Sequence, residues 1–131
     1  MRTPYLFVYG TLMQTSGHTM HQKLMAGSKF VCHGWITAQL YQIHDYPGVI
    51  ESENQADRVY GEVYRLTDPG LLALLDDFET CSNAFPEPHE YRRKEIEVFV
   101  SAAKTLRAWA YVYNHPVDPL KRIRSGKFRR G

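Results

Sequence analysis

The stretch Phe7-Val8-Tyr9-Gly10-Thr11-Leu12-Met13 lies near the N-terminus and is the part of the chain around which we organise the expected fold. The apolar and aromatic run Tyr5–Tyr9 is typical of a buried strand, and Gly10 ends it. Because glycine has no Cβ, backbone N–H groups at this strand end can come close to a small ligand. A simple turn is the alternative, and only a chemical partner elsewhere in the chain can decide between the two.

Composition indicates one globular domain. The chain has 131 residues, of which 44% are hydrophobic and 23% charged, which excludes an intrinsically disordered chain and suffices for one buried core. No apolar run approaches the roughly 20 residues of a membrane helix, and the N-terminus lacks a signal-peptide pattern. The two cysteines, Cys32 and Cys81, are too few for a disulfide scaffold. We therefore expect a cytoplasmic protein with free thiols and no membrane partner.

The charge of the chain is distributed unevenly. Ten basic and thirteen acidic residues give −3 for residues 1–114, and six basic and one acidic residue give +5 for residues 115–131. This division predicts a domain over residues 1–114 and a basic, loosely held C-terminal tail over residues 115–131. Nucleic-acid binding by the tail would be steeply salt-dependent, but a solvated end is the commoner case, so nucleic acid is not the expected partner.

Hydrophobic periodicity predicts five or six strands and two helices. The expected strands are Tyr5–Tyr9, Phe30–Ile43 with a bend or bulge at Gly34, a short Val49-Ile50, Arg58–Leu66, Tyr91–Val100 and Leu106–Asn114. The expected helices are His18–Ala26 and Pro69–Glu79, the second starting at Thr67-Asp68-Pro69. Many strands with few crossover helices favour an α+β fold, a mostly antiparallel curled sheet or small barrel, over a doubly wound sheet. The last strand alternates Trp109, Tyr111 and Tyr113 on one face with Ala108, Ala110 and Val112 on the other.

The second helix carries the most informative acidic residue. One arc of its surface holds Leu71, Leu72, Leu74, Leu75 and Phe78. Glu79 falls inside this arc, whereas Asp76 lies just beyond its edge and Asp77 points away, so only Glu79 is expected to face the core. Burial and the negative end of the helix dipole would both raise the pKa of Glu79 toward that of a general base near neutral pH. A frayed last turn with Glu79 in water stays open as the alternative.

Other candidate sites have less support. His18 and His21 could share a helix face, but no third residue has matching spacing, so no metal is expected. Cys32 and Cys81 are expected to be small buried residues rather than nucleophiles. Residues 92–94 could bind an anion, although alternate residues of a strand face opposite ways. No nucleophilic serine elbow or phosphate-binding glycine loop is present, and no cofactor is expected.

Seven segments, in order over residues 5–113, resemble the γ-glutamylcyclotransferase-like (AIG2-like) proteins. They are Phe7–Leu12, Gly17-x-x-x-His21-x-x-Leu24, Tyr46-Pro47-Gly48, Val59-Tyr60-Gly61-Glu62-Val63-Tyr64, Leu74-Leu75-Asp76-x-x-Glu79, Tyr91-x-Arg93 and Ala108-Trp109-Ala110-Tyr111-Val112-Tyr113. The resemblance implies a small closed β-barrel with flanking helices and an enzyme of the acyltransferase type that forms no covalent intermediate.

The resemblance also implies a reaction. The α-amine of a γ-glutamyl substrate attacks the γ-carbonyl, closes 5-oxoproline and expels an amine or amino acid. An intramolecular nucleophile has a proximity advantage of up to ~7–11 kcal/mol, so no serine or cysteine nucleophile is needed. By resemblance Glu79 is the general acid and base, and Tyr91 contributes a hydrogen bond. The loop Tyr9, Gly10, Thr11 and Leu12 holds the γ-glutamyl group through backbone amides, which could also stabilise the oxyanion.

The chain departs from the family pattern at three places. Thr80 follows Glu79 where a glycine is common, Met20 stands where asparagine is frequent, and the loop from Glu79 to Tyr91 is longer than usual. These differences leave open which γ-glutamyl amine or peptide is the substrate. A non-catalytic module of the same fold that binds a γ-glutamyl or amino-acid ligand is the alternative function. The sequence does not predict the oligomeric state.

Overall fold

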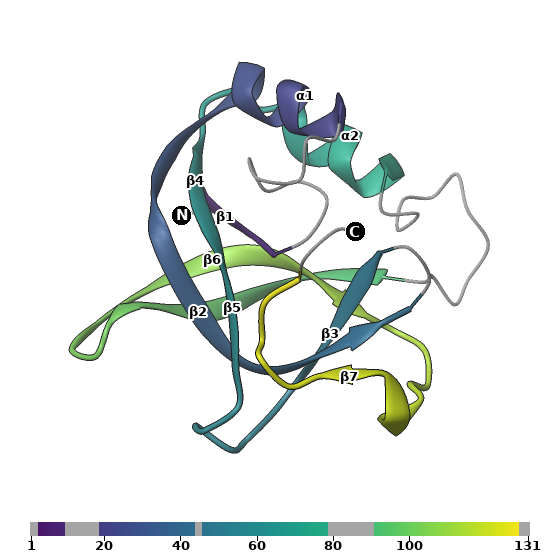
Figure 1. The fold of residues 1–131 in the computed structure, drawn as a ribbon. Helices are drawn as coiled ribbons and strands as arrows, with labels where there is room; N and C mark the ends of the chain where they lie inside the picture. Colours follow the sequence, from purple (N-terminus) through teal and green to yellow (C-terminus); the bar gives the residue numbers. More distant parts are fainter. Residues whose placement is uncertain (1–2, 10–18, 44–45, 79–90, 129–131) are drawn as a thin grey trace.

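The architecture is known from a computed structural model that describes residues 3–9, 19–43, 46–78 and 91–128 (Figure 1). Each expected helix and strand is present among the described residues. The strand at 58–66 has the predicted boundaries, and those of the other elements are shifted by a few residues. In chain order the elements are β1 (Tyr5–Val8), α1 (Thr19–Gly27), β2 (Ser28–Gln42), β3 (Pro47–Glu51), β4 (Arg58–Leu66), α2 (Leu71–Phe78), β5 (Tyr91–Ser101), β6 (Lys104–Tyr113), the 3-10 helix η2 (Pro119–Lys121) and β7 (Arg122–Ile123).

Five strands close into a barrel in the order β2-β4-β1-β6-β5, and β5 returns to β2 through the pair Trp35 and Phe99. All of these pairings are antiparallel except that of β1 with β6. Strands β3 and β7 both pair with the C-terminal half of β2. The prediction of an α+β, mostly antiparallel small barrel is confirmed, and closure of the barrel agrees with the family resemblance.

Strand β2 closes the barrel because it pairs with β4 and also meets β5, which approaches it closely at Gly34. A Cβ on Gly34 would lie 2.8 Å from the carbonyl oxygen of Phe99, closer than real side chains approach. The irregularity predicted at Gly34 lies earlier in the strand, where the β2–β4 register shifts between Phe30 and Cys32. Gly34 therefore serves a close crossing of two strands, and the bulge is a separate feature.

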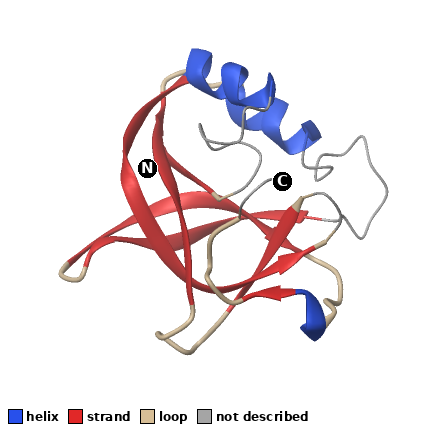
Figure 2. Ribbon diagram, viewed as in Figure 1, coloured by secondary structure: helices blue, strands red, loops and turns tan. Residues whose placement is uncertain are grey.

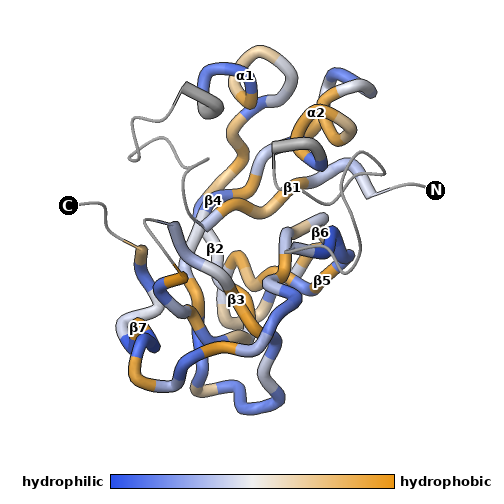
Figure 3. The backbone as a smooth tube through the Cα atoms, turned by 90° about the vertical axis from the view of Figure 1, so that its right-hand side faces the viewer, coloured by the Kyte–Doolittle hydropathy of each residue, from blue (hydrophilic) through white to orange (hydrophobic). Residues whose placement is uncertain are grey.

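Two apolar clusters lie on the two faces of the sheet. Strand β6 shows the division, because Ala108, Ala110 and Val112 enter the barrel interior while Tyr111 packs under the helices. Trp109 and Tyr113 are half-buried on the same outer face as Tyr111, so the predicted alternation is confirmed. Helices α1 and α2 lie on one side of the barrel, and the short η2 lies apart from them (Figure 2). Figure 3 shows β7 at the end away from α1 and α2. None of the described helices has the length and apolarity to cross a membrane.

Helix α2 buries a narrower stripe than its sequence predicts. Leu71 and Leu75 are buried against the barrel, but Leu74 is 39% exposed, so its assignment to the core-facing arc is wrong. The helix also begins two residues later than expected. The carboxylate of Asp68 accepts a hydrogen bond from the amide of Gly70 (2.9 Å), which places the capping residue in the turn before the helix.

The C-terminal segment is held against the barrel, so the expectation of a loosely held tail is wrong for residues 118–128. Strand β7 pairs with β2, and the amide of Tyr60 donates to the carbonyl oxygen of Gly126 (2.8 Å). Gly126 has a φ of 70°, which glycine adopts without strain. Phe128 is 8% exposed and belongs to the barrel-interior cluster. The net charge of the segment predicted a solvated tail, whereas the pairing of β7, the Gly126 carbonyl and the Phe128 side chain attach it to the barrel.

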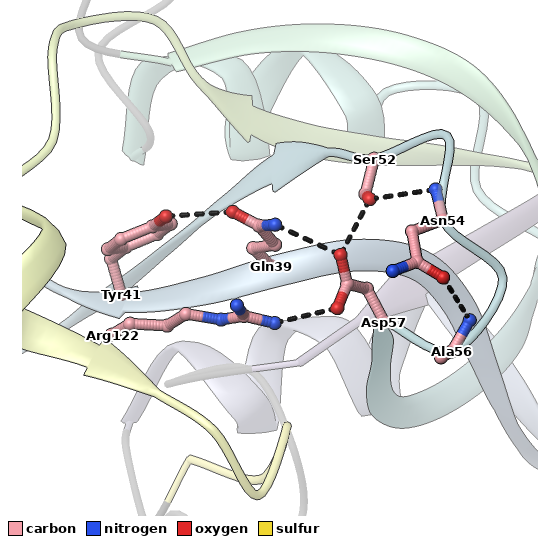
Figure 4. A network of polar contacts seen from close by, with 7 residues as sticks. All are labelled: Gln39, Tyr41, Ser52, Asn54, Ala56, Asp57 and Arg122. Atoms are coloured by element: carbon pink, nitrogen blue, oxygen red, sulfur yellow. Dashed lines mark hydrogen bonds and ion pairs between the residues drawn. The ribbon is translucent and has the colours of Figure 1, made fainter.

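A polar network ties the start of this segment to the body of the barrel (Figure 4). The Asp57 carboxylate accepts hydrogen bonds from Gln39 (2.9 Å) and Ser52 (2.7 Å) and forms an ion pair with Arg122 (2.8 Å). These hydrogen bonds, first from Gln39, then Ser52 and Arg122, lower the pKa of Asp57 to about 2. Asp57 is therefore ionised at any physiological pH and keeps Arg122 in place.

Candidate active site

Two of the expected site residues, Tyr9 and Tyr91, lie beside the C-terminal end of β6. Tyr9 follows β1, and Tyr91 is the first residue of β5 and pairs with Tyr113. Both tyrosines are buried. The other four expected residues, Gly10, Thr11, Leu12 and Glu79, lie outside the described residues. The structure therefore describes the residues that flank these four in the chain, Tyr9 among them.

Tyr9 fixes the point at which the chain leaves β1. Its hydroxyl donates a hydrogen bond to the main-chain carbonyl of Tyr111 (2.5 Å), and its side chain is buried in the barrel-interior cluster beside Phe7. The hydroxyl proton is thus directed at β6. Tyr9 is the residue immediately before Gly10, so this hydrogen bond anchors the chain at that point.

Tyr91 connects the start of β5 to the start of β3. Its hydroxyl donates to the carbonyl of Pro47 (2.6 Å), and its ring lies 6.3 Å from that of Tyr46 and 5.5 Å from that of Tyr113. The adjacent Gly48 has no room for a side chain, because a Cβ there would lie 2.8 Å from the Cβ of Tyr113. The Tyr46-Pro47-Gly48 segment therefore packs closely on the outer face of β6, beside Tyr91.

Asp76 faces the barrel, contrary to the prediction that Glu79 alone among the three acids would do so. The carboxylate of Asp76 is 17% exposed and accepts hydrogen bonds from Arg93 on β5 and from Tyr111 on β6. Its position at the edge of the apolar arc was the signal in the sequence, but helical spacing alone did not show that a tyrosine and an arginine lie opposite it.

Arg93 and Lys94 take different partners, as alternation along a strand predicts. Arg93 forms the ion pair with Asp76 and lies over the ring of Trp109 at 4.6 Å, whereas Lys94 contacts Glu51 at 2.6 Å. Residues 92–94 are therefore not one anion-binding patch. Arg93 belongs to the face under the helices, next to the expected site.

Glu62 is a second acid that the sequence did not single out. It is 3% exposed, lies opposite Val8 in the β1–β4 register, and accepts a hydrogen bond from Tyr64 (3.0 Å). Burial and the neighbouring Glu62 carboxylate raise the pKa of the Tyr64 phenol, so the phenol stays protonated as a donor. An acid within an otherwise apolar strand was the available signal, since a buried carboxylate is costly unless it is hydrogen-bonded.

The cysteine and histidine candidates form neither an activated nucleophile nor a metal-ligand group within the part of the chain that the structure describes. Cys32 is half-buried and has a free thiol, and burial raises the pKa of this thiol, which disfavours the nucleophilic thiolate. Within the described ranges no three His, Cys, Asp or Glu side chains are grouped to hold a metal ion. Cys81, His18 and the side chain of His21 lie outside what the structure describes.

The barrel, the helices on one side of it and the tyrosine-rich strand ends agree with a known family. The family model described as "Gamma-glutamyl cyclotransferase, AIG2-like" matches residues 6–130. The chain belongs to this family. The match includes the C-terminal segment, which the seven motifs did not cover.

Individual relatives agree with this assignment. The gamma-glutamylcyclotransferase family protein YtfP of Escherichia coli K12 is 36% identical over 123 residues, 92% of each chain. The gamma-glutamylaminecyclotransferase of Bos taurus is 31% identical over 111 residues, 76% of this chain and 58% of the bovine one. The crystal structure of an AIG2-like protein from Mus musculus matches with a TM-score of 0.72 at 22% identity, covering 98% of this chain and 90% of the other. Family membership supports a cyclotransferase-like activity, and the mouse structure supports the fold.

Proposed function

We propose that this protein is an enzyme that converts a γ-glutamyl amine or γ-glutamyl peptide to 5-oxoproline and a free amine or amino acid. The observation that carries the proposal is the contact of Tyr111 with both Tyr9 and Asp76. Tyr9 is one residue before Gly10, and Asp76 is three residues before Glu79. Since consecutive Cα atoms are about 3.8 Å apart, short lengths of chain connect both proposed site segments to the same tyrosine.

The proposed reaction needs no nucleophile from the protein. The α-amino nitrogen of the substrate forms a bond to the γ-carbonyl carbon, the carbonyl oxygen takes up negative charge, and the bond to the leaving nitrogen then breaks. The attacking nitrogen loses two protons in all, one from the ammonium group before attack and one from the adduct as the lactam N–H forms. The leaving nitrogen gains one proton and departs as an amine as the carbonyl re-forms, and the other proton is released to solvent or taken up by the free amine. A single carboxyl group can therefore accept a proton from the attacking nitrogen and deliver it to the leaving nitrogen. Within this proposal Glu79 is that group, and general acid–base catalysis of this kind contributes about 10²- to 10⁴-fold.

The loop Gly10-Thr11-Leu12 has the complementary proposed role. Its backbone amides would bind the γ-glutamyl group and stabilise the oxyanion, where the loss of one donor typically costs about 3 kcal/mol. Tyr9 and Tyr91 support the site within this proposal by fixing the ends of β1 and β5, since both hydroxyl protons are directed at main-chain carbonyls. The described surroundings are thus aromatic, buried and hydrogen-bonded to the main chain, which suits a site that must hold a flexible substrate in a cyclising conformation.

The test measures 5-oxoproline released from a panel of γ-glutamyl amines and γ-glutamyl amino acids, beginning with the amines because a relative is named for them. Glu79→Gln should lower kcat at least 100-fold with an unchanged melting temperature. Glu53→Gln, which removes an exposed acid in the turn before β4, is the matched control and should retain full activity. An active Glu79→Gln variant would refute the assignment of the general base.

The same panel tests the non-catalytic alternative. If γ-glutamyl compounds raise the melting temperature of the wild-type protein but no compound yields 5-oxoproline, the protein is a binding module and the enzymatic proposal is wrong. Release of product by the wild-type protein at a rate that depends on Glu79 excludes this alternative.

A further inference from the structure

Asp76 is held by a bidentate ion pair and a phenol. The Arg93 Nε donates to Oδ1 of Asp76 at 2.8 Å and its terminal nitrogen donates to Oδ2 at 3.2 Å. The hydroxyl of Tyr111 donates to the same Oδ1 at 2.7 Å. Arg93 and Tyr111 are cross-strand partners in the β5–β6 register. One carboxylate of α2 is therefore bonded to two adjacent strands.

Arg93 is itself fixed by its neighbours. Its guanidinium carbon lies 4.6 Å from the centre of the Trp109 ring, and the Trp109 indole N–H donates to the carbonyl of Thr3 (3.2 Å). A planar guanidinium can stack on an indole and form two parallel hydrogen bonds at once, which a lysine ammonium cannot do. The arginine at this position is thus specific in geometry as well as in charge.

Asp76 stands at an unfavourable end of its helix. Helix α2 has eight residues, and Asp76 lies in its last turn, where the helix dipole disfavours an anion. An isolated helix of this length is unstable in water, so its position depends on packing and on contacts such as those of Asp76. The hydrogen bonds from Arg93 and Tyr111 offset the unfavourable placement and fix the end of the helix against the barrel.

We propose that Asp76, Arg93 and Tyr111 form a positioning unit for the reaction. Their hydrogen bonds orient the end of α2 toward the end of β1, and the positive charge of Arg93 offsets the negative charge of Asp76. This inference rests on the proposed function, because it assigns the unit to the presentation of Glu79. Tyr111 is central to it, since its carbonyl accepts from Tyr9 and its hydroxyl donates to Asp76. None of the three residues is proposed to react with substrate.

The charge part of the proposal predicts pH shifts of opposite sign. Arg93→Gln removes the cation that is paired with Asp76 and should raise the pH at which the acid limb of kcat/KM falls. Asp76→Asn leaves the Arg93 cation unpaired and should lower it. A unit charge about 10 Å from a carboxyl group shifts its pKa by roughly 0.3–0.6 units at low salt. The double variant should return the limb to within about 0.2 units of the wild-type position.

Other titratable groups nearby do not reproduce this pattern. Asp76 faces Arg93 on β5 and Tyr111 on β6, and Glu95, two residues after Arg93, accepts a hydrogen bond from Thr3 and contacts Arg107. The remaining described titratable groups on this side are all unchanged in both variants. They include Tyr46 before β3, Glu62 and Tyr64 on β4, Tyr91 on β5, Tyr113 on β6 and His115 beyond it. Both variants keep these groups, so among the described residues a difference in sign between the two shifts comes from the Asp76–Arg93 pair.

The experiment records pH profiles of kcat and kcat/KM for these variants in 10 mM buffer, with Tyr111→Phe and the control Lys94→Gln. Lys94→Gln removes a cation from the adjacent position of β5 and from a different ion pair. Tyr111→Phe should lower kcat about tenfold with an unmoved limb, and Lys94→Gln should change neither quantity. If the unit had a purely structural role, Arg93→Gln and Asp76→Asn would both lower activity without shifting the acid limb in opposite directions. That result overturns the proposal, and so does an unchanged kcat in all variants.

Failure of the proposed function gives a different result. If the wild-type protein releases no 5-oxoproline, the positioning unit is judged by hydrogen exchange of the amides in residues 5–12 and 71–79. Arg93→Gln and Asp76→Asn should then raise exchange in both segments, whereas Lys94→Gln should not. Equal exchange in the wild-type protein and the three variants overturns the positioning role. If instead the wild-type protein is active and the variants have the same kcat and pH profiles, the inference is overturned while the proposed function stands.

Discussion

The replacement Phe128→Ala tests the attachment of the C-terminal segment, which the sequence predicts to be loose and the structure shows to be packed. The Phe128 side chain lies in the barrel-interior cluster with 8% of its surface exposed. Replacing a buried phenylalanine by alanine in a protein core costs about 3–5 kcal/mol. Because Phe128 lies close to the chain end, the segment can partly collapse into the space, and we expect the lower end of this range, about 3 kcal/mol.

This free energy converts to a measurable melting temperature. An unfolding entropy of about 2.1 cal/mol/K per residue gives about 0.28 kcal/mol/K for 131 residues. A loss of about 3 kcal/mol therefore lowers the melting temperature by about 10 °C. The same loss should appear as a lower urea midpoint with an unchanged m-value, since the folded state keeps its compactness.

The matched control lies in the same segment. Leu120 is 93% exposed, so Leu120→Ala should change the stability by less than about 0.5 kcal/mol, or about 2 °C. If Phe128→Ala melts within about 2 °C of the wild-type protein, burial of the Phe128 side chain contributes nothing measurable to stability, and the role assigned to this side chain is wrong.

Two further predictions concern the barrel. Gly61→Ala should destabilise the protein by about 3 kcal/mol in urea unfolding, because the new Cβ would lie 2.2 Å from the carbonyl oxygen of Val8. Gly70→Ala is the control and should be neutral, because the nearest atom to its Cβ would lie at 3.4 Å. Because the folded-state pKa of Asp57 is lowered to about 2 from 3.8, its ionised form stabilises the protein fully above pH 4, and this contribution is lost as the pH falls toward 2. Urea midpoints of the wild-type protein and Asp57→Asn should therefore converge between pH 4 and 2, and a constant difference would contradict the role of the Asp57 network.

Local sequence signals predicted the elements well because they depend on neighbouring residues. Alternation placed Ala108 and Tyr111 on opposite faces of β6, and both the barrel interior and the layer under the helices follow from it. The resemblance identified the family through seven segments in order, among them Phe7–Leu12 and Leu74-Leu75-Asp76-x-x-Glu79. The expected site residues Gly10, Thr11, Leu12 and Glu79 lie outside the described residues, so their roles stay predictions.

Long-range contacts could not be predicted in the same way. The helical arc of α2 counted Leu74 as buried and left Asp76 at its edge, because spacing does not show which side chains lie opposite a helix. Arg93 and Tyr111 are 17 and 35 residues from Asp76 in the chain, and only closure of the barrel brings them to it. Glu62 was missed for the same reason, since its hydrogen-bond partner and its burial depend on neighbouring strands.

By itself the sequence determined the strands, the two helices, the two faces of the sheet and the family, because each of these is encoded in local periodicity or in short motifs. The tertiary structure alone decided that Phe128 enters the barrel, that Asp57 holds Arg122, and that Tyr111 joins the end of β1 to the end of α2. These contacts join segments that are far apart in the chain. Their geometry is set by strand register and barrel closure, which no local pattern of residues specifies.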